Sequence, residues 1–469
     1  MDLTVETTPI PGLLVLRLPV HRDARGWFKE NWQRARMVAL GLPDFGPVQN
    51  NMSLNARRGA TRGVHTEPWD KLVSVATGRV FAAWVDMRAG DTFGTTYSVE
   101  VDEGVAVFVP RGVGNSYQAL EDGTVYSYLV NDHYVPGHAY PALDLADPTV
   151  AIPWPIPLDS AEVEISDKDR ANPRLDAVVP MEPRKTLITG CRGQLGQALA
   201  RLYPDADLVD LGPSTSPGQR ELDLTDPDAL AAWSWRDYGV VLNAAAYTAV
   251  DKAEGEGRAT AWAANAAAPT ALARIATEHN LTLVHYSTDY VFDGQEVPGG
   301  HREDEAMAPL GVYGQTKAAG DLGVATTPRH YVLRTSWVIG EGNNFVRTMQ
   351  RLAADGISPA VVHDQVGRLT FTSELARATR HLLDSAAPYG VYNVTNGGEP
   401  RSWAAYAKRV FELSGRSPDD VTTTTTEEYA AGKALSPRPL FSTLNLDKLA
   451  ATGFTPADAD EALAAYLRL

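Results

Sequence analysis

The chain has 469 residues, of which 44% are hydrophobic and 21% charged, so we expect a globular protein of two or three domains. Its net charge of −16 argues against nucleic acid or an anionic membrane surface as the main partner.

The number of cysteines and the first residues of the chain indicate the cellular compartment in which the protein is expected. Cys191 is the single cysteine, which excludes an intramolecular disulfide and argues against a cysteine-rich zinc site. Residues 1–6 are acidic, no signal-type apolar run follows them, and no apolar run is long enough to span a bilayer. We therefore expect a cytoplasmic protein without a membrane partner.

Residues 1–182 have the pattern of an all-β domain. Tyr97, Val99 and Val101 alternate with polar residues, as in a half-buried strand. Residues 80–85, 105–109 and 125–130 are short runs rich in Val and aromatic residues, separated by Gly, Asp or Pro. Many short strands with turn signals between them predict a β-sandwich or a jelly roll.

His65 is the first candidate for chemistry in this half. Many jelly-roll enzymes hold metals, but a metal site needs several converging His or carboxylate ligands, and no His-x-His pair lies near His65. We expect no metal here.

Several short motifs give this half a more specific assignment. They are residues 23–28 (D-A-R-G-W-F), 48–51 (V-Q-N-N), 62–65 (R-G-V-H), 70–73 (D-K-L-V), 92–94 (T-F-G), 110–112 (P-R-G), 126–128 (Y-S-Y), 147–148 (D-P) and 166–169 (S-D-K-D). Together they resemble the dTDP-4-dehydrorhamnose 3,5-epimerase family, which implies an all-β, cupin-like jelly roll for residues 1–182. The resemblance implies that His65 is the base, oriented by Asp169, that Tyr128 is the acid on the opposite sugar face, and that Lys71 stabilises the enolate.

The same resemblance implies a nucleotide-sugar pocket and a homodimer formed through this half. The expected pocket residues are Arg25, Glu30, Gln49, Asn51, Arg62 and Tyr134. Two positions depart from the family pattern: Asn115 stands where a histidine is usual, and His133 where a tyrosine is common. Asn115 can form hydrogen bonds but cannot titrate, so these changes concern the substrate and the number of centres inverted.

The boundary between the halves is expected near residue 182. Pro173, Pro180 and Pro183 lie in a short span that cannot continue a helix or a central strand. A new strand-turn-helix unit begins directly afterwards, so we expect a second domain over residues 183–469.

This second domain begins with the pattern of a dinucleotide site. Residues 185–189 form a short apolar strand, a glycine-rich turn follows, and helix-forming residues come next. Glycines at such a junction let the backbone approach a pyrophosphate at a helix N-terminus. Asp210 ends the next strand, where an acid binds the adenosine ribose, which favours NADH over NADPH, although Arg220 could serve a 2′-phosphate.

Two later strands and one helix complete the expected site. Residues 240–246 and 281–289 are buried strands that end in small or hydroxyl residues. Tyr313 and Lys317 lie four residues apart, on one face of a helix. A nearby Lys⁺ lowers a tyrosine pKa, so we expect Tyr313 to give a proton to a carbonyl oxygen, with Thr288 hydrogen-bonded to the same oxygen.

Motifs in this half place it among the extended short-chain dehydrogenases. They are residues 243–252 (N-A-A-A-Y-T-A-V-D-K), 285–292 (H-Y-S-T-D-Y-V-F), 313–317 (Y-G-Q-T-K), 334–338 (R-T-S-W-V), 342–345 (G-N-N-F), 364–365 (D-Q) and 437–439 (P-R-P). Within that group the half resembles dTDP-4-dehydrorhamnose reductase, which implies an α/β Rossmann fold with a smaller substrate-binding subdomain.

The resemblance also implies roles for individual residues of this half. The catalytic set is Thr288, Tyr313 and Lys317. The expected cofactor residues are Gly190, Arg192, Gly193, Gln194, Leu195, Gly196, Asp210, Asp223, Leu224, Ala244, Ala245 and Ala246, with Tyr313 and Lys317. The expected substrate residues are Thr248, Asp289, Trp337, Asn344 and Arg438, with core packing an equal alternative for Trp337. The family's magnesium is not expected, since residues 197–199 carry no acid.

The two resemblances imply consecutive reactions on one dTDP-linked 4-keto-6-deoxy sugar. The first half would epimerise C-3 and C-5, and the second would reduce the C-4 ketone with NADH or NADPH to give dTDP-L-rhamnose. Three alternatives stay open. The first half could be a non-catalytic binding or dimerisation module, the second half could be a regulatory subunit, or the product could be another 6-deoxyhexose.

Overall fold

The computed structural model describes residues 2–134, 140–212 and 218–468. The chain divides into two compact units, Met1–Pro183 and Arg184–Leu469. Within the described residues, no helix combines the length and apolar character needed to cross a membrane. The same ranges hold no group of three or more His, Cys, Asp or Glu side chains placed to bind a metal ion.

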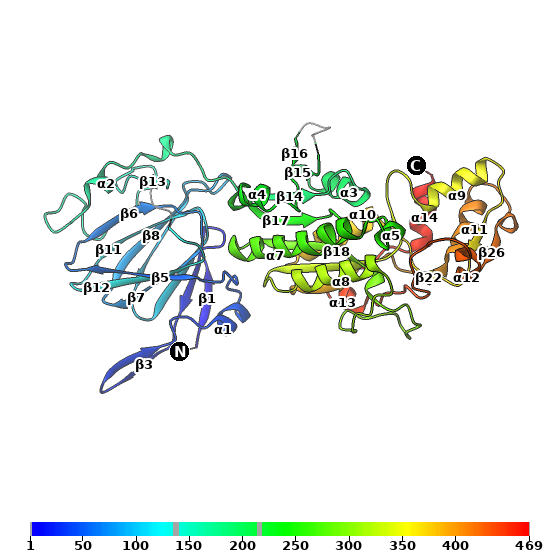
Figure 1. Ribbon diagram of the computed structural model, residues 1–469. Helices are drawn as coiled ribbons and strands as arrows, with labels where there is room; N and C mark the ends of the chain where they lie inside the picture. Colours follow the sequence, from blue (N-terminus) through cyan, green and yellow to red (C-terminus); the bar gives the residue numbers. More distant parts are fainter. Residues whose placement is uncertain (1, 135–139, 213–217, 469) are drawn as a thin grey trace. The chain divides into compact units, whose positions relative to one another are not determined.

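The N-terminal unit is built from two antiparallel sheets (Figure 1). The first has the order β1 (Thr4–Thr7), β2 (Leu14–Arg17), β10 (Val105–Val109), β7 (Lys71–Thr77), β12 (Thr124–Val130) and β5 (Gln49–Asn55). The second has the order β13 (Ala142–Leu143), β6 (Thr61–His65), β11 (Val113–Ala119), β8 (Val80–Asp86) and β9 (Thr96–Val101). This confirms the predicted β-rich jelly-roll domain.

The two sheets share a core because their strands alternate inward and outward residues. Val73 and Val107 of the first sheet and Trp84 and Tyr117 of the second belong to one buried cluster. Outside the two sheets lie the hairpin β3 (Val20–Asp23) and β4 (Gly26–Lys29) and the helices α1 (Arg34–Ala39) and α2 (Asp167–Arg170).

The C-terminal unit contains a seven-stranded sheet with helices on its faces (Figure 1). Its order is β16 (Gln219–Glu221), β15 (Asp207–Asp210), β14 (Lys185–Thr189), β17 (Tyr238–Asn243), β18 (Thr282–Thr288), β19 (His330–Thr335) and β24 (Gly390–Asn393). All neighbouring strands are parallel. The order reverses next to β14, which is where doubly wound sheets bind their ligands. The predicted Rossmann architecture is confirmed.

Helices cover the sheet with their apolar faces. One buried cluster joins the sheet to α3 (Gln194–Leu202) and α10 (Thr372–Asp384), and another joins it to α7 (Ala268–Glu278) and α8 (Val312–Val324). The C-terminal unit also contains the shorter helices α4 (Pro227–Ala231), α5 (Val250–Ala253), α6 (Arg258–Trp262) and α13 (Asp447–Ala450). A π-helical turn, η3 (Ala263–Ala267), connects α6 to α7.

A smaller subdomain has a buried cluster of its own. It is formed by α9 (Phe345–Ala354), α11 (Trp403–Leu413) and α14 (Ala459–Leu467), with α12 (Thr426–Ala430) beside them. Short strand pairs complete it: β20 (Val338–Ile339) with β23 (Thr370–Phe371), β21 (Ala360–Val362) with β26 (Thr422–Thr424), and β22 (Val366–Gly367) with β25 (Arg401–Ser402).

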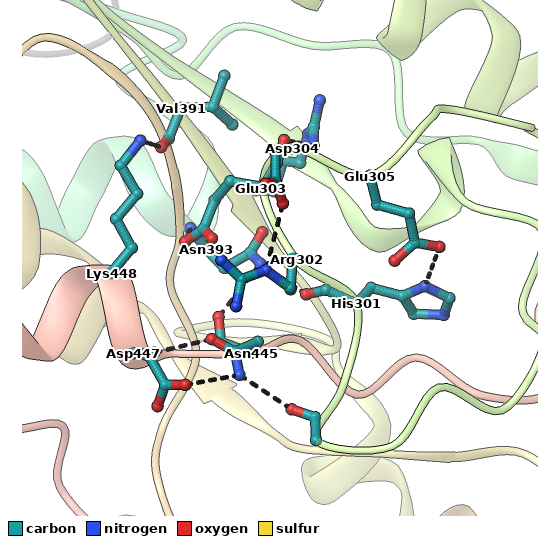
Figure 2. A network of polar contacts seen from close by, with 12 residues as sticks. His301, Arg302, Glu303, Asp304, Glu305, Val391, Asn393, Asn445, Asp447 and Lys448 are labelled. Carbon is teal, nitrogen blue, oxygen red and sulfur yellow. Dashed lines mark hydrogen bonds and ion pairs between the residues drawn. The ribbon is translucent and has the colours of Figure 1, made fainter.

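Side chains and a loop satisfy the backbone of the edge strand β24 (Figure 2). Lys448 Nζ donates to the carbonyl of Val391 at 2.7 Å. The backbone N–H of Asn393 donates to Glu303 Oε1 at 3.0 Å, and its side chain donates to the carbonyl of His301 at 2.8 Å. These contacts occupy groups that an open sheet edge would present to another strand.

Candidate active sites

The predicted base of the N-terminal unit is paired with a buried carboxylate. His65 ends β6, and its Nε2 lies 2.7 Å from Oδ1 of Asp169 in α2. The other oxygen, Oδ2, accepts the backbone N–H of Gly63 at 3.1 Å. Asp169 is 6% exposed, and burial alone raises the pKa of its carboxyl; the hydrogen bonds from His65 and Gly63 outweigh burial and hold that pKa below its ordinary value. An ionised Asp169 holds the imidazole in a fixed orientation.

The predicted acid and enolate-binding cation lie on neighbouring strands. Tyr128 is in β12 and Lys71 is in β7, with Lys71 Nζ 5.9 Å from the centre of the Tyr128 ring. Burial, with a smaller contribution from the charge of Glu67, raises the pKa of Tyr128 above its ordinary value. Tyr128 is therefore protonated at neutral pH, as a proton donor must be.

Lys71 is not a free cation. It is buried and forms an ion pair with Glu67, a residue that the sequence motifs did not single out. Its ammonium therefore carries a counter-ion before any substrate enters.

The structure brings some of the predicted pocket residues together and leaves others apart. Gln49 and Asn51 lie on the inner face of β5, where Gln49 Nε2 donates to Asn51 Oδ1 at 2.8 Å. His133 Nδ1 lies 3.0 Å from Gln49 Oε1, which ties one departure from the family pattern to the predicted pocket. Arg62 donates to Asn55 Oδ1 at 3.3 Å.

The remaining predicted pocket residues are largely exposed. Arg25 pairs with Asp23, Glu30 pairs with Arg36, and Tyr134 is 58% exposed. The charges of Arg25 and Glu30 are thus engaged in ion pairs with residues close to them in the sequence.

Asn115, the other departure, contacts the buried Tyr126. It pairs with His65 in the register between β11 and β6, and its Oδ1 accepts the hydroxyl of Tyr126 at 3.0 Å. The side chain therefore fixes a buried phenol instead of titrating.

A cavity of about 470 Å³ lies at the glycine-rich turn of the C-terminal unit. The predicted cofactor residues that line it are Gly190, Arg192, Gly193, Asp210, Asp223, Leu224, Ala244, Ala245 and Ala246. Sequence reasoning missed Tyr247, Thr260 and Ala264, which also line it. The remaining predicted cofactor residues, Gln194, Leu195 and Gly196, are in α3, outside this lining.

Close backbone packing explains two of the glycines. Gly190 has a φ of +64°, and a Cβ there would lie 2.6 Å from Cα and N of Ala245. A Cβ at Gly196 would lie 2.1 Å from the carbonyl oxygen of Gly190. Only glycine at these two positions lets the turn pack this closely against the segment that follows β17 and against α3. The N-terminus of α3 is then open to an anion. These residues fit a dinucleotide.

Asp210 is already engaged at the end of β15. Its Oδ2 accepts the backbone N–H of Arg192 at 2.9 Å, and its Oδ1 accepts the N–H of Leu211 at 2.8 Å. The Arg192 guanidinium also pairs with Oδ1 at 3.2 Å. Arg220, the residue expected to serve a 2′-phosphate, instead lies over the ring of Trp233 at 3.9 Å. The cation beside Asp210 is therefore Arg192.

The predicted catalytic residues lie on β18 and α8. Thr288 ends β18, and its hydroxyl donates to Asp289 Oδ1 at 3.0 Å. Lys317, 2% exposed, donates to the carbonyl of Tyr286 at 2.5 Å. Burial lowers the pKa of Lys317 to about 8, against a smaller opposing effect of Asp321.

The expectation of a lowered tyrosine pKa is wrong for the protein without ligands. Burial, and after it the charges of Asp289 and Tyr290, raise the pKa of Tyr313 well above its ordinary value, although the Thr288 hydroxyl opposes them. Lys317 points its ammonium at a backbone carbonyl instead of at the phenol. Tyr313 is thus a protonated phenol.

A second cavity, of about 580 Å³, lies at the smaller subdomain. Arg438 lines it and donates to Asp251 Oδ1 at 2.8 Å, and Trp403 lines it as well. Sequence reasoning did not identify Asp251 or Trp403 as site residues. Asp251 lies within the motif 243–252 and could have been found there, whereas Trp403 has no motif around it.

Three other predicted substrate residues are engaged within the protein itself, by ring stacking, by helix capping or by burial. Trp337 stacks on Trp403 with ring centres 3.8 Å apart, so the packing alternative describes it. Asn344 caps α9 by accepting the N–H of Arg347 at 3.0 Å. Asp289 is 3% exposed, and burial raises its pKa to about 6. The fourth, Thr248, is exposed and lies outside the lining of both cavities.

Family models match both units. Residues 7–177 match the model described as dTDP-4-dehydrorhamnose 3,5-epimerase, and residues 184–469 match the model described as RmlD substrate binding domain.

Individual relatives support the same division. A protein named "Protein RmlC homolog" from Streptococcus pyogenes is 44% identical over 188 residues, which are 38% of this chain and 92% of that protein. A dTDP-4-dehydrorhamnose reductase from Aggregatibacter actinomycetemcomitans is 37% identical over 292 residues, 60% of this chain and 97% of that protein.

Solved structures agree for the C-terminal unit. A dTDP-4-dehydrorhamnose reductase from Clostridium acetobutylicum has a TM-score of 0.54 and 35% identity, and covers 61% of this chain and 98% of its own. A reductase from Bacillus anthracis in complex with NADP has a TM-score of 0.55 and 31% identity, and covers 61% of this chain and 99% of its own. The chain therefore belongs to the dTDP-4-dehydrorhamnose 3,5-epimerase family through its N-terminal unit and to the dTDP-4-dehydrorhamnose reductase family through its C-terminal unit.

Proposed function

We propose that the chain is a bifunctional enzyme of dTDP-L-rhamnose synthesis. It epimerises dTDP-4-dehydro-6-deoxy-D-glucose at C-3 and C-5 and then reduces the C-4 ketone. The observation that carries this proposal is that one chain holds both sets of groups. His65 with Asp169 and Tyr128 belong to the N-terminal unit. Thr288, Tyr313 and Lys317 belong to the C-terminal unit, which also has a dinucleotide-sized cavity at its glycine-rich turn.

In the first reaction the ketone makes the neighbouring C–H bonds acidic. His65 removes a proton from one face of the sugar, and the protonated Tyr128 returns one on the other face. Lys71 stabilises the enolate oxygen with its positive charge. Inversion needs this pair of groups, since a single group would return the proton to the face it came from.

In the second reaction a bound nicotinamide cofactor supplies the hydride. Tyr313 donates its proton to the C-4 oxygen, and Thr288 holds that oxygen by a hydrogen bond. Lys317 orients the cofactor and favours loss of the phenolic proton. Arg438, at the subdomain cavity, places the nucleotide part of the substrate.

NADH is the favoured cofactor in this proposal, and NADPH is also accepted. The Asp210 carboxylate repels a 2′-phosphate, whereas Arg192 beside it attracts one. A relative with NADP bound is consistent with the second part of the proposal.

Isotope labelling separates the two reactions. Product made by the full-length chain in D₂O with unlabelled NADPH should carry deuterium at C-3 and C-5 and hydrogen at C-4. His65→Ala should stop deuterium uptake without preventing cofactor binding, and Tyr313→Phe should stop reduction without affecting uptake. Loss of deuterium uptake in Tyr313→Phe, or failure of His65→Ala to oxidise NADPH when it is supplied with the epimerised ketone, would contradict two separate sites.

This experiment also tests the non-catalytic alternative for the N-terminal unit. A chain that oxidises NADPH with an epimerised ketone, yet takes up no deuterium, has a binding module in place of an epimerase. A relative named "Probable dTDP-4,6-dihydroxy-2-methyloxan-3-one 4-ketoreductase" from Streptomyces antibioticus, 40% identical over 276 residues, favours testing that class of ketone too.

We further propose a homodimer through the N-terminal unit. β5 is an edge strand of its sheet, and its outward residues Met52 and Leu54 are 67% and 64% exposed. Exposed apolar side chains on a sheet edge are usually covered by a partner. Met52→Lys should reduce the mass measured by light scattering to that of one chain, whereas Val179→Lys, at another exposed apolar position, should not. An unchanged mass for Met52→Lys would contradict this interface.

A further inference from the structure

A row of buried polar side chains crosses the C-terminal sheet and ends at Lys317. Thr189, Asn243 and His285 are direct register neighbours on the adjacent strands β14, β17 and β18. Thr189 Oγ1 donates to Asn243 Oδ1 at 2.7 Å, and Asn243 Nδ2 lies 3.1 Å from His285 Nδ1. His285 Nε2 lies 3.4 Å from Lys317 Nζ. The exposures of the four residues are between 0% and 2%.

Such a row is costly in the middle of an apolar sheet unless each member is satisfied. Strands buried on both faces are usually continuous Val, Ile and Leu, so an apolar residue would serve stability better at position 285. The residues next to it on β18, Val284 and Tyr286, are apolar or aromatic and belong to the core beneath α3. The histidine therefore has a role other than packing.

The hydrogen bonds couple the row to the charge of Lys317. In the orientation present, Asn243 donates to Nδ1, so the neutral ring carries its proton on Nε2 and directs a donor at Lys317. If the Asn243 amide turns over, its oxygen accepts Nδ1–H, and its nitrogen donates to Thr189. Nε2 then presents a lone pair to the ammonium. The first arrangement suits an uncharged Lys317, and the second suits a charged one.

We propose, on the basis of the reductase function above, that His285 is a positioning residue for the reduction. When the Asn243 amide turns over and its oxygen accepts Nδ1–H, His285 accepts a hydrogen bond from Lys317 through Nε2. This keeps the ammonium charged and in place while Tyr313 gives up its proton. Burial, and after it the charge of Lys317, hold the pKa of His285 well below its ordinary value, which keeps the ring a neutral acceptor.

Other charged groups face Lys317 and act in parallel. Asp321 lies one turn further along α8 and favours the ammonium, and it is itself paired with Arg334 of β19 at 3.1 Å. Tyr313 lies one turn earlier on α8. Because Asp321 remains in every variant below, a change in the titration of Lys317 reports on His285.

The test uses the full-length chain and the pH dependence of reduction with saturating NADPH. His285→Phe fills the space but removes the acceptor, so the alkaline limb of kcat should move to lower pH by about one unit, with about a fivefold loss at pH 8. His285→Gln keeps an acceptor and should bring the limb back. His381→Phe, which removes a partly buried histidine that bonds to Thr452, should leave the limb in place.

If the alkaline limb of kcat for His285→Phe superimposes on that of the wild type, the proposal is overturned, whatever happens to the absolute rate. NADPH binding measured by fluorescence across the same pH range gives a readout that needs no turnover. If the wild type binds NADPH but reduces no 4-keto sugar, the proposed function fails, while the shift in the binding profile still decides the role of His285.

Discussion

Replacing Gly63 by alanine should disable the epimerase through the carboxylate behind its base. A Cβ at Gly63 would lie 2.6 Å from Asp169 Oδ1 and 2.7 Å from its Cγ. Comfortable contacts between carbon atoms are about 3.5–4.0 Å, so the carboxylate has to withdraw by close to 1 Å. That displacement breaks the 2.7 Å contact with His65. A hydrogen bond to a charged group contributes about 1.5–3 kcal/mol, so exchange should slow by about 10- to 100-fold.

The assay is the rate of deuterium uptake at C-3 and C-5 in D₂O, with NADPH oxidation of an epimerised ketone as the internal control. Gly104→Ala is the matched variant in the same unit, because its nearest new contact is 3.3 Å, to Asp102 Oδ1. Asp169→Asn removes the negative charge and so shows how far the exchange rate falls when the carboxylate is lost. If Gly63→Ala exchanges at the wild-type rate while Asp169→Asn does not, the carboxylate does not act through the geometry described here.

Three further outcomes are expected in the C-terminal unit. Asp210→Ala should raise the ratio of kcat/KM for NADPH over NADH by about tenfold, because it removes a like charge from the 2′-phosphate and leaves Arg192 free to bind it; an unchanged ratio would place cofactor choice elsewhere. Gly190→Ala should abolish cofactor binding in a fluorescence titration, since its Cβ would meet Ala245 at 2.6 Å; retained affinity would contradict the close approach. Burial lowers the pKa of Lys317 from its ordinary value of 10.5 to about 8. Between these values the unfolded chain binds more protons than the folded chain, so the free energy of unfolding should rise with pH there, by up to about 3 kcal/mol, but not in Lys317→Met.

Local patterns in the sequence were sufficient to predict the fold of both units. The alternation around Val99 and the strand-turn-helix at Gly190 each fit within a few neighbouring residues, and short-range geometry determines them. The position of Tyr313 and Lys317 on one helix, α8, was predictable for the same reason.

Properties that depend on burial and on distant partners could not be predicted in this way. Helical spacing places Lys317 one turn from Tyr313 but does not say that its ammonium meets the carbonyl of Tyr286. Likewise, the partner of Arg438 is Asp251, 187 residues away in the chain. Such pairings depend on how separate segments pack in the folded chain, so a single sequence contains no periodic signal for them.

The two sites differ in their access to water, and the difference follows from their chemistry. The side chain of His65 is 39% exposed, whereas Lys317 is 2% exposed. After one inversion His65 holds an extra proton and Tyr128 lacks one, so both must exchange protons with water before the second centre can be inverted. In the reduction Tyr313 gives up a single proton and regains it between turnovers, so water can be excluded during hydride transfer. That exclusion strengthens every charge interaction around the C-4 oxygen. An exposed base in the first site and a buried ammonium in the second are therefore what consecutive double epimerisation and reduction require.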